Sequence, residues 1–539
     1  MSRPKPAILL TVLVAALALL GGVSVLQGGF YVAKHEGDTL HLLQILLRMA
    51  DGEWPHLDFV TPIGVMAFLP IVAFLKAGLG AGEAILWSQV LVALVLLPAT
   101  FWAAHSRFSN GLAYLFGISV MVLTLALVHG ESDRLVSISM HYNRWAWAVA
   151  YIVVILAVLP PVGSRRDGID GTIIGLGMAL LAVTKVTYFI SFAPAVLIAL
   201  ILYKAHKTLL FALVAGLAVA AVITVAAGPT FWGAYVSDLI HVARSDVRPA
   251  PGVSLNTLLG APAYLGGSLT VLAGIIFLRQ AGEEKLGLLL LLLAPGFFYV
   301  TYQNFGNDPQ WLVLFAILLL APKVSQEVTG VMGLPMRTAL MVAGVAALSF
   351  ATPSMLNLAY SPFRHATLDA DKYSPLLAKS QIHNDLFGLT VRSNRVDGSI
   401  ALDVAGGGLE DRRELGDRED THAVFKGEPL PDCELTLGLI AWFETIVANL
   451  ETSGFGGASI YAADIFTSHW LFGDIKRLEQ GAPWYYGGLP GIDHASHVII
   501  PMCPASLGLR RTVLDVIEER GIPLREVHRH PLYILVAIE

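Results

Sequence analysis

The sequence is poor in charged residues and in cysteine. Asp, Glu, Lys and Arg make up 14% of its 539 residues, whereas they make up about 25% of an average soluble protein. Hydrophobic residues make up 55%, and the mean hydropathy is +0.65. This composition excludes a disordered chain, a nucleic-acid-binding protein and an ordinary soluble enzyme, and it indicates a polytopic α-helical membrane protein. With only 2 cysteines, a disulfide scaffold and a cysteine-based zinc cluster are also excluded.

The motifs of common cofactor chemistry are missing as well. There is no phosphate-binding P-loop, no dinucleotide-binding glycine pattern after a strand and no HExxH sequence. Histidine and aspartate occur, but not at the spacings typical of metal ligands. The sequence therefore predicts no cofactor and gives no support for a nucleotide-sugar donor, while a divalent metal ion stays an alternative.

Long apolar runs fill the chain up to about Thr352, and they predict about eleven transmembrane helices. Residues 353–539 have a soluble composition and predict a C-terminal α/β domain. The run at 63–79 contains Pro70 and Lys76, and it either crosses the membrane or lies at its surface. The predicted spans are Ala7–Leu26, Glu83–Ala104, Leu112–Val128, Trp145–Leu159, Gly171–Val183, Tyr188–Leu202, Thr208–Ala227, Leu258–Leu278, Leu286–Val300, Trp311–Ala321 and Ala339–Phe350.

The distribution of basic residues predicts the orientation. If 63–79 does not cross, Lys and Arg are concentrated in the short inside loops, as the positive-inside tendency requires. We therefore expect a multi-pass protein of the inner or plasma membrane with a cytoplasmic N-terminus. The C-terminal domain and the polar loops, of which 28–82 is the first, are then extracytoplasmic.

The first outer loop contains two candidate carboxylates. Asp38 begins a predicted amphipathic surface helix, where it acts either as an N-cap or as a group free for chemistry. Asp58 lies between apolar neighbours near the bilayer, where an ionisable side chain is costly and is often functional. Its alternative role is that of a hydrogen-bonded loop anchor.

Asp38, the helix after it and the stretch Gly52-Glu53-Trp54-Pro55-His56-Leu57-Asp58-Phe59 together resemble the GT-C glycosyltransferases. That superfamily includes protein O-mannosyltransferases and lipid A aminoarabinose transferases. Its usual stretch reads Gly-x-x-Pro-Tyr-x-Asp-Phe, so His56 stands here where tyrosine is common. The resemblance covers residues 1–352.

The resemblance implies an enzyme that takes a sugar from a polyprenyl phosphate on the outer leaflet. A hydroxyl of a glycan, lipid or protein acceptor attacks the anomeric carbon with inversion. Asp38 would be the base, and Asp58 and His56 would contact the sugar or the acceptor. A carboxylate can accept the hydroxyl proton if it is held within hydrogen-bond reach.

The leaving lipid phosphate requires cationic partners. Lys185 lies inside a long apolar stretch, so it either faces a phosphate cavity or forms a turn between two short spans. Arg144, close after Tyr142 at the start of a span, either binds the phosphate bidentately or anchors the helix at the interface. Arg244 and Arg248 share a helical face and either bind an anion or form a solvated charge cluster.

Two further features belong to the outer face. The amide-rich loop with Asn304, Asn307 and Asp308 suits sugar hydroxyls, although a plain turn has the same composition. In the C-terminal domain, Cys433 and Cys503 would lie on the oxidising side and could form a disulfide. Aromatic residues 484–486 could stack on sugars or pack in the core. The domain is also predicted to contain strands at Ala458–Tyr461, Ser496–Ile500 and Leu532–Ala537, helices at Leu435–Leu450 and Ala505–Arg520, and a mobile loop at Asp403–Gly427.

Other functions compete with the transferase. An O-antigen polymerase or ligase would act on similar lipid-linked glycans, but its large outer loop usually lies late in the chain. A transporter often shows two related halves, and no such repeat is visible. A non-enzymatic receptor would not require Asp38 and Lys185 in one cavity.

Overall fold

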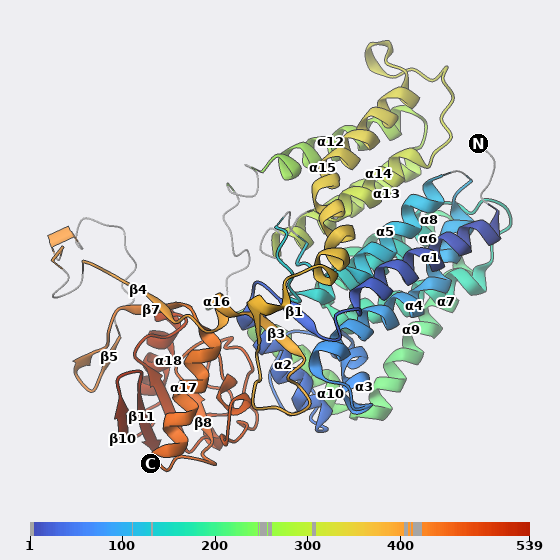
Figure 1. The fold of residues 1–539 in the computed structure, drawn as a ribbon. Helices are drawn as coiled ribbons and strands as arrows, with labels where there is room; N and C mark the ends of the chain where they lie inside the picture. The colour runs from blue at the N-terminus through green and yellow to red at the C-terminus, as the bar shows by residue number, and fades with distance from the viewer. Residues whose placement is uncertain are drawn as a thin grey trace.

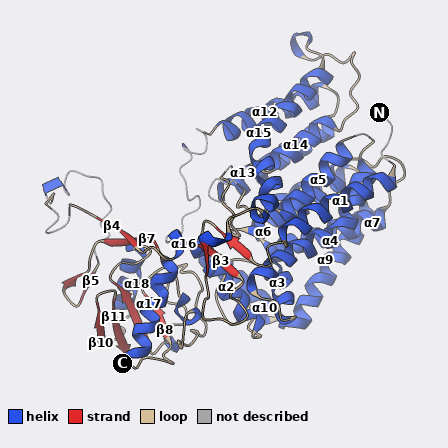
Figure 2. Cartoon of the chain, in the orientation of Figure 1, coloured by secondary structure: helices blue, strands red, loops and turns tan. Residues whose placement is uncertain are grey.

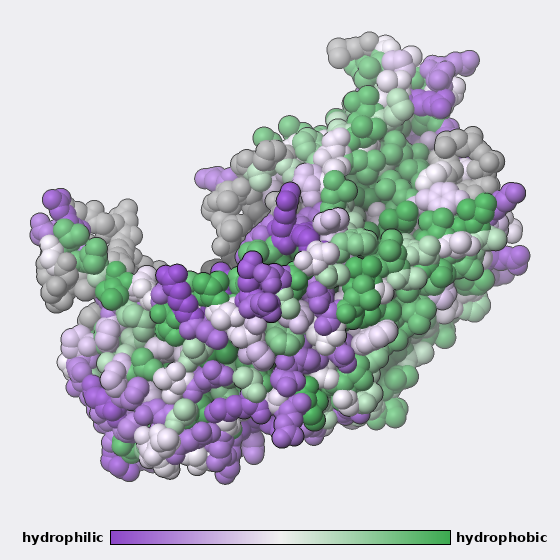
Figure 3. Space-filling view, in the orientation of Figure 1, coloured by the Kyte–Doolittle hydropathy of each residue, from purple (hydrophilic) through white to green (hydrophobic). Residues whose placement is uncertain are grey.

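The computed structural model describes residues 5–109, 111–130, 133–245, 247, 256, 261–303, 309–403, 408–409, 411–412 and 423–539. A bundle of long helices occupies the upper right of Figure 1, and a smaller domain built from the C-terminal part of the chain lies at the lower left. Figure 2 shows that the strands gather in and beside this smaller domain. In Figure 3 the visible face of the bundle is mainly hydrophobic, whereas the smaller domain is mainly hydrophilic.

Among the described residues, seven helices are long and apolar enough to cross a membrane. Helix α9 is typical: its 22 residues span about 33 Å, enough for the hydrocarbon core of a bilayer. Many of its large apolar side chains point outward, and Val225 is 88% exposed. Such a surface is stable in lipid and not in water, so the chain is a helical membrane protein. The seven helices are α1 (Pro6–Ser24), α4 (Ala81–Arg107), α7 (Asp167–Thr184), α9 (His206–Ala227), α12 (Pro262–Gln280), α13 (Glu284–Gln303) and α15 (Met336–Ala366).

Four other helices coincide with the remaining predicted spans. They are α5 (Leu112–Leu125), α6 (His141–Val158), α8 (Val186–Leu202) and α14 (Trp311–Leu320). The total of about eleven spans stays a prediction, because length and apolar composition alone qualify only the seven.

The ambiguous segment 63–79 does not form a membrane-crossing helix. It contains a short 3₁₀ turn at Val65–Ala67 and the helix α3 (Leu69–Lys76). The 8 residues of α3 reach only about 12 Å, less than half of the hydrocarbon thickness. A helix of this length is too short to cross a bilayer by itself, which favours the non-spanning interpretation of this segment.

Helix α15 passes through the composition change at residue 352 without a break. It continues to Ala366, although Pro353 and Pro362 lie within it. The last bundle helix thus enters the C-terminal part of the chain directly, beyond the expected domain boundary.

The C-terminal domain is built around a sheet with the strand order β10-β11-β9-β8. Strands β8 and β9 are parallel, as predicted for some strands, and the other two pairings are antiparallel. Along β11, Tyr533 and Leu535 face one core cluster, and Ile534 and Val536 face another. Helix α17 packs in the first cluster and α18 in the second, so a helix covers each face of the sheet. The elements are α17 (Leu439–Thr452), β8 (Ile460–Ala462), β9 (His497–Pro501), α18 (Leu507–Glu519), β10 (Leu524–His530) and β11 (Tyr533–Ile538).

Two details of this domain differ from the sequence prediction. The helix expected from Leu435 begins at Leu439, because Cys433–Leu437 forms strand β7 and pairs with β4 (Asp397–Ile400). Strand β10 was not predicted, because its sequence LREVHRH is mostly charged and polar. Cys433 and Cys503 form the anticipated disulfide. The predicted mobile loop 403–427 lies largely outside the described residues.

The first outer loop and the C-terminal domain share one structure. Strand β1 (Phe30–Val32) pairs in parallel with β3 (Leu386–Leu389), which pairs in turn with β2 (Tyr373–Pro375). Helix α2 (Glu36–Ala50) packs in the same core cluster as α17. Residues more than 300 positions apart therefore hold the loop in a fixed place.

The polar face of α2 does not face water, as an amphipathic surface helix would. Gln44 Nε2 donates to Ser468 Oγ (3.0 Å) and to the carbonyl of Pro483 (2.9 Å). Arg48 donates to the carbonyl of Leu478 (2.9 Å). The polar face of α2 therefore forms an interface with the C-terminal domain. The sequence pattern of one helix cannot distinguish such an interface from a face exposed to water.

Candidate functional site

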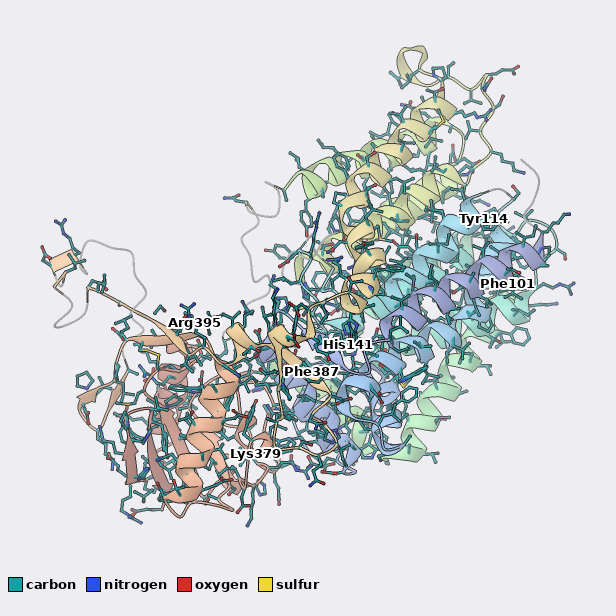
Figure 4. All side chains as sticks on the ribbon, viewed as in Figure 1. Phe101, Tyr114, His141, Lys379, Phe387 and Arg395 are labelled. Atoms are coloured by element: carbon teal, nitrogen blue, oxygen red, sulfur yellow. A yellow bond between two sulfur atoms is a disulfide. The ribbon has the colours of Figure 1, made fainter. Side chains whose placement is uncertain are left out.

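The candidate site lies where the first outer loop meets the beginning of α6. In Figure 4, His141, the first residue of α6, lies toward the end of the bundle that faces the C-terminal domain, whereas Phe101 and Tyr114 lie at the opposite end. Met140, immediately before the helix, has a left-handed backbone (φ 51°). This conformation is uncommon for a side chain without a short polar group, and such conformations concentrate at functional sites.

Asp38 points to this segment. Ser139 Oγ donates a hydrogen bond of 2.6 Å to Asp38 Oδ2. The carboxylate is half-buried and has further lone pairs that can accept a proton or a hydroxyl hydrogen bond. Asp38 is not the N-cap that its position suggested: α2 begins two residues earlier, at Glu36, after His35 in a left-handed conformation.

Two histidines and an ion pair lie near Asp38. His35 Nδ1 lies 3.0 Å from Ser137 Oγ, and the rings of His35 and His129 are 5.2 Å apart. Lys34 Nζ pairs with Asp133 at 2.9 Å. Burial, and then the neighbouring His35, lower the pKa of His129 from 6.5 to about 3. His129 is therefore neutral at physiological pH and adds no positive charge beside Asp38.

The lowered pKa of His129 predicts a pH dependence of stability. The unfolded chain binds a proton at this residue below about pH 6.5, and the folded chain does so only near pH 3, so acidification removes stability. We expect the melting temperature of His129→Asn to fall less than that of the wild type between pH 7 and pH 4. Thermal unfolding in detergent at several pH values measures the difference, and a pH-independent difference would contradict the prediction.

Lys185 occupies the break between two helices. Helix α7 ends at Thr184 and α8 begins at Val186, and Lys185 between them has an extended backbone (φ −151°). Its ammonium nitrogen lies 5.4 Å from the centre of the Tyr142 ring, which is cation–π distance. Lys185 is thus both the turn residue and a cation beside the start of α6, so the two expected roles are compatible.

Two other segments meet this helix break. The amide of Gly64, from the first outer loop, donates to the carbonyl of Thr184 (3.1 Å). On the other side, the hydroxyl of Thr187 donates to the side-chain oxygen of Gln303 at the end of α13. Three other parts of the chain therefore contact Lys185 or its neighbours in the helix break.

Three other candidate residues are committed to structural contacts. Asp58 accepts a hydrogen bond of 2.6 Å from the backbone amide of Trp54, which is the loop-anchor alternative. Arg144 is fully buried and donates to the carbonyls of Ala126 (2.8 Å) and Val128 (2.5 Å), beyond the C-terminus of α5. His56 lies in the same outer loop as Asp58, and its Nδ1 is 2.9 Å from a carboxylate oxygen of Asp238 on α10 (Thr230–Ala243).

The remaining candidates lie elsewhere or were not described. Arg244 lies on a cleft beside the C-terminal domain. Tyr485 and Tyr486 are buried, so they do not form the exposed stacking platform that was one of their two expected roles. Arg248, Asn304, Asn307 and Asp308 lie outside the described residues.

Sequence reasoning missed several residues that position Asp38. Glu36, the first residue of α2, accepts two hydrogen bonds from Arg392 of α16 (Thr390–Ser393), at 2.7 and 3.1 Å. A Cβ on Gly37 would lie 2.4 Å from the Phe466 ring, so a side chain at this position would have to push the ring aside. The acidic stretch itself was visible in the sequence, but its partners were too distant along the chain to be identified.

Among the residues that the structure describes, no three His, Cys, Asp or Glu side chains form a group able to hold a metal ion. Comparison with known proteins gives no relative: no family model, no curated protein and no solved structure matches this chain. Its function has to be inferred from the chemistry of the residues around Asp38 and Lys185.

Proposed function

We propose that this protein is a membrane glycosyltransferase of the GT-C type, which moves a sugar from a polyprenyl phosphate to an acceptor hydroxyl. One observation carries the proposal: Asp38 and Lys185 both contact the short segment Ser139–Tyr142 at the start of α6. A carboxylate and an ammonium thus flank one helix terminus. Proton acceptance and phosphate binding are the two tasks that the reaction assigns to such groups.

An apolar groove near Lys185 supports a lipid donor. The groove has a volume of about 320 Å³ and runs between α3, α4, α6 and α7. Thr184, the neighbour of Lys185, and Trp145, in the first turns of α6, line it, and almost all of its other lining residues are apolar. A prenyl chain in this groove would place its phosphate near the ammonium, at the end of the apolar region.

The proposed reaction is a single displacement. The acceptor oxygen forms a bond to the anomeric carbon as its proton passes to the Asp38 carboxylate. The bond between the anomeric carbon and the phosphate oxygen breaks, and the polyprenyl phosphate leaves with the electron pair. Lys185 stabilises the charge that develops on that phosphate.

The test uses the purified full chain and a panel of radiolabelled polyprenyl-phosphate sugars. We expect one donor to lose its sugar, to a glycan or lipid acceptor or slowly to water, with stoichiometric release of polyprenyl phosphate. If folded protein neither binds nor consumes any donor of the panel, the proposal is wrong.

Lys185→Ala should weaken donor binding far more than acceptor binding. Loss of a charge-assisted contact to phosphate typically costs about 1.5–3 kcal/mol, which raises the donor KM by roughly 10- to 100-fold. Initial rates at varied donor and fixed acceptor concentration measure the effect. Lys207→Ala is the matched control, because Lys207 is an exposed lysine in the first turn of α9. An unchanged donor KM in Lys185→Ala would remove Lys185 from the site.

A further inference from the structure

Apart from the apolar groove, a cleft lies between α10 and the C-terminal domain. Its volume is about 510 Å³, within the range of small-molecule binding sites. The C-terminal part of α10 and the residues after it form one wall, with His241 and Arg244. The segment Tyr485–Gly488 and Thr512 of α18 form the other wall.

The groups lining this cleft include hydroxyls, apolar side chains and one fixed cation. The guanidinium of Arg244 is exposed and has no partner among the described residues. Tyr485 also lines the cleft, but it is only 3% exposed. Its hydroxyl is buried and has no hydrogen-bond partner among the described residues. Hydroxyls of Ser237, Ser245 and Thr512 also line the cleft, and none of its described lining residues is acidic.

Two glycines keep the cleft open. Gly487 (φ 106°) and Gly488 (φ 65°) have backbone conformations that side chains rarely adopt. A Cβ on Gly487 would point into the cleft, 3.3 Å from Ser245 Oγ. The imidazole Nε2 of His241 donates to the carbonyl of Gly487 (3.2 Å), which ties this segment to α10.

Helix α10 connects the cleft to the loop that carries Asp38. On another face of the helix, Asp238 accepts hydrogen bonds from His56 and from the backbone amide of Thr61 (3.1 Å). A ligand in the cleft therefore contacts a helix that is fixed to the first outer loop.

We propose that the cleft binds the acceptor through an anionic sugar residue, one that carries a carboxylate or a phosphate. This proposal rests on the proposed transferase function and specifies its acceptor. The Arg244 guanidinium binds the anion through two parallel hydrogen bonds, a geometry that suits both carboxylate and phosphate. The hydroxyls of Ser237, Ser245 and Thr512, which also line the cleft, donate to the sugar oxygens.

The experiment measures binding to the full chain by calorimetry, without any donor. Three soluble probes separate the sources of charge: a galacturonic acid disaccharide, its methyl ester, and a sugar phosphate such as glucose 1-phosphate. We expect one of the two anionic probes to bind at least 10-fold more tightly than the neutral methyl ester. The anionic probe that binds more tightly shows whether the cleft prefers a carboxylate or a phosphate.

Variants then test the residues. Arg244→Ala should lower the affinity for the preferred anionic probe by roughly 10- to 100-fold, as expected for loss of a charged hydrogen bond. Ser237→Ala removes an exposed hydroxyl of the cleft wall, so the chain should fold normally while the probe binds several-fold more weakly. Arg525→Ala, at an exposed arginine of β10 paired with Glu539, is the matched control.

The proposal is wrong if neither anionic probe binds more tightly than the methyl ester, or if Arg244→Ala and Ser237→Ala both bind like the wild type. These measurements need no turnover. A failure here is therefore distinguishable from a failure of the transferase proposal, which the polyprenyl-phosphate sugars test separately.

Discussion

Asp38→Asn should lower the rate of sugar transfer by about 100- to 10,000-fold, the range that a positioned general base typically contributes. The side-chain oxygen of asparagine can still accept the hydrogen bond of 2.6 Å that Ser139 donates. The fold and donor binding should therefore stay close to those of the wild type. Single-turnover transfer with a saturating donor measures the chemical step directly.

Asp51→Asn is the matched control for Asp38→Asn. Asp51 ends the same helix, α2, and pairs with Arg477 of the C-terminal domain (2.5 Å). It carries the same charge and takes the same substitution, but lies at the other end of the helix. We expect a near-normal rate, and a wild-type rate in Asp38→Asn itself would show that another group accepts the proton.

The membrane part of the fold could be predicted because a bilayer demands a long apolar run from each spanning helix. All of the predicted runs are helices, and the short length of α3 agrees with the argument from loop charges. The approximate position of Lys185 at a helix break also followed from its place inside an apolar stretch. The helix ends were less accurate, because polar residues such as His141 and Asn143 extend α6 beyond its apolar core.

The partners of the candidate residues could not be predicted, because they depend on packing between distant segments. Arg392 and Glu36 are separated by 356 positions, and Asp238 and His56 by 182. Nothing in either local sequence indicates the other. For the same reason the polar stripe of α2 appeared to face water, although it faces a domain that begins more than 300 residues later.

Gly64→Ala should have the largest structural effect, because it acts where the first outer loop meets the helix break. A Cβ at this position would lie 2.1 Å from the carbonyl oxygen of Val183 and 2.9 Å from the amide nitrogen of Thr184. Both are backbone atoms, which cannot rotate away as a flexible side chain can. Overpacking of this kind costs about 1–3 kcal/mol, and more when the backbone must move. We expect a melting temperature several degrees lower, measured by thermal unfolding, and weaker donor binding, measured by donor titration.

Gly22→Ala is the control for the substitution itself. Gly22 lies within α1, and a Cβ there would meet nothing within 4 Å. Alanine favours a helix over glycine by about 1 kcal/mol, so this variant should be neutral or slightly more stable. In Gly64→Ala the loop must instead move away from the carbonyl of Thr184, to which the Gly64 amide donates, and Lys185 follows directly in the chain. A variant that melts and binds donor like the wild type would show that this contact does not hold Lys185 in place. A folded variant with normal acceptor binding and weakened donor binding would show that the close approach of the loop sets the position of the ammonium.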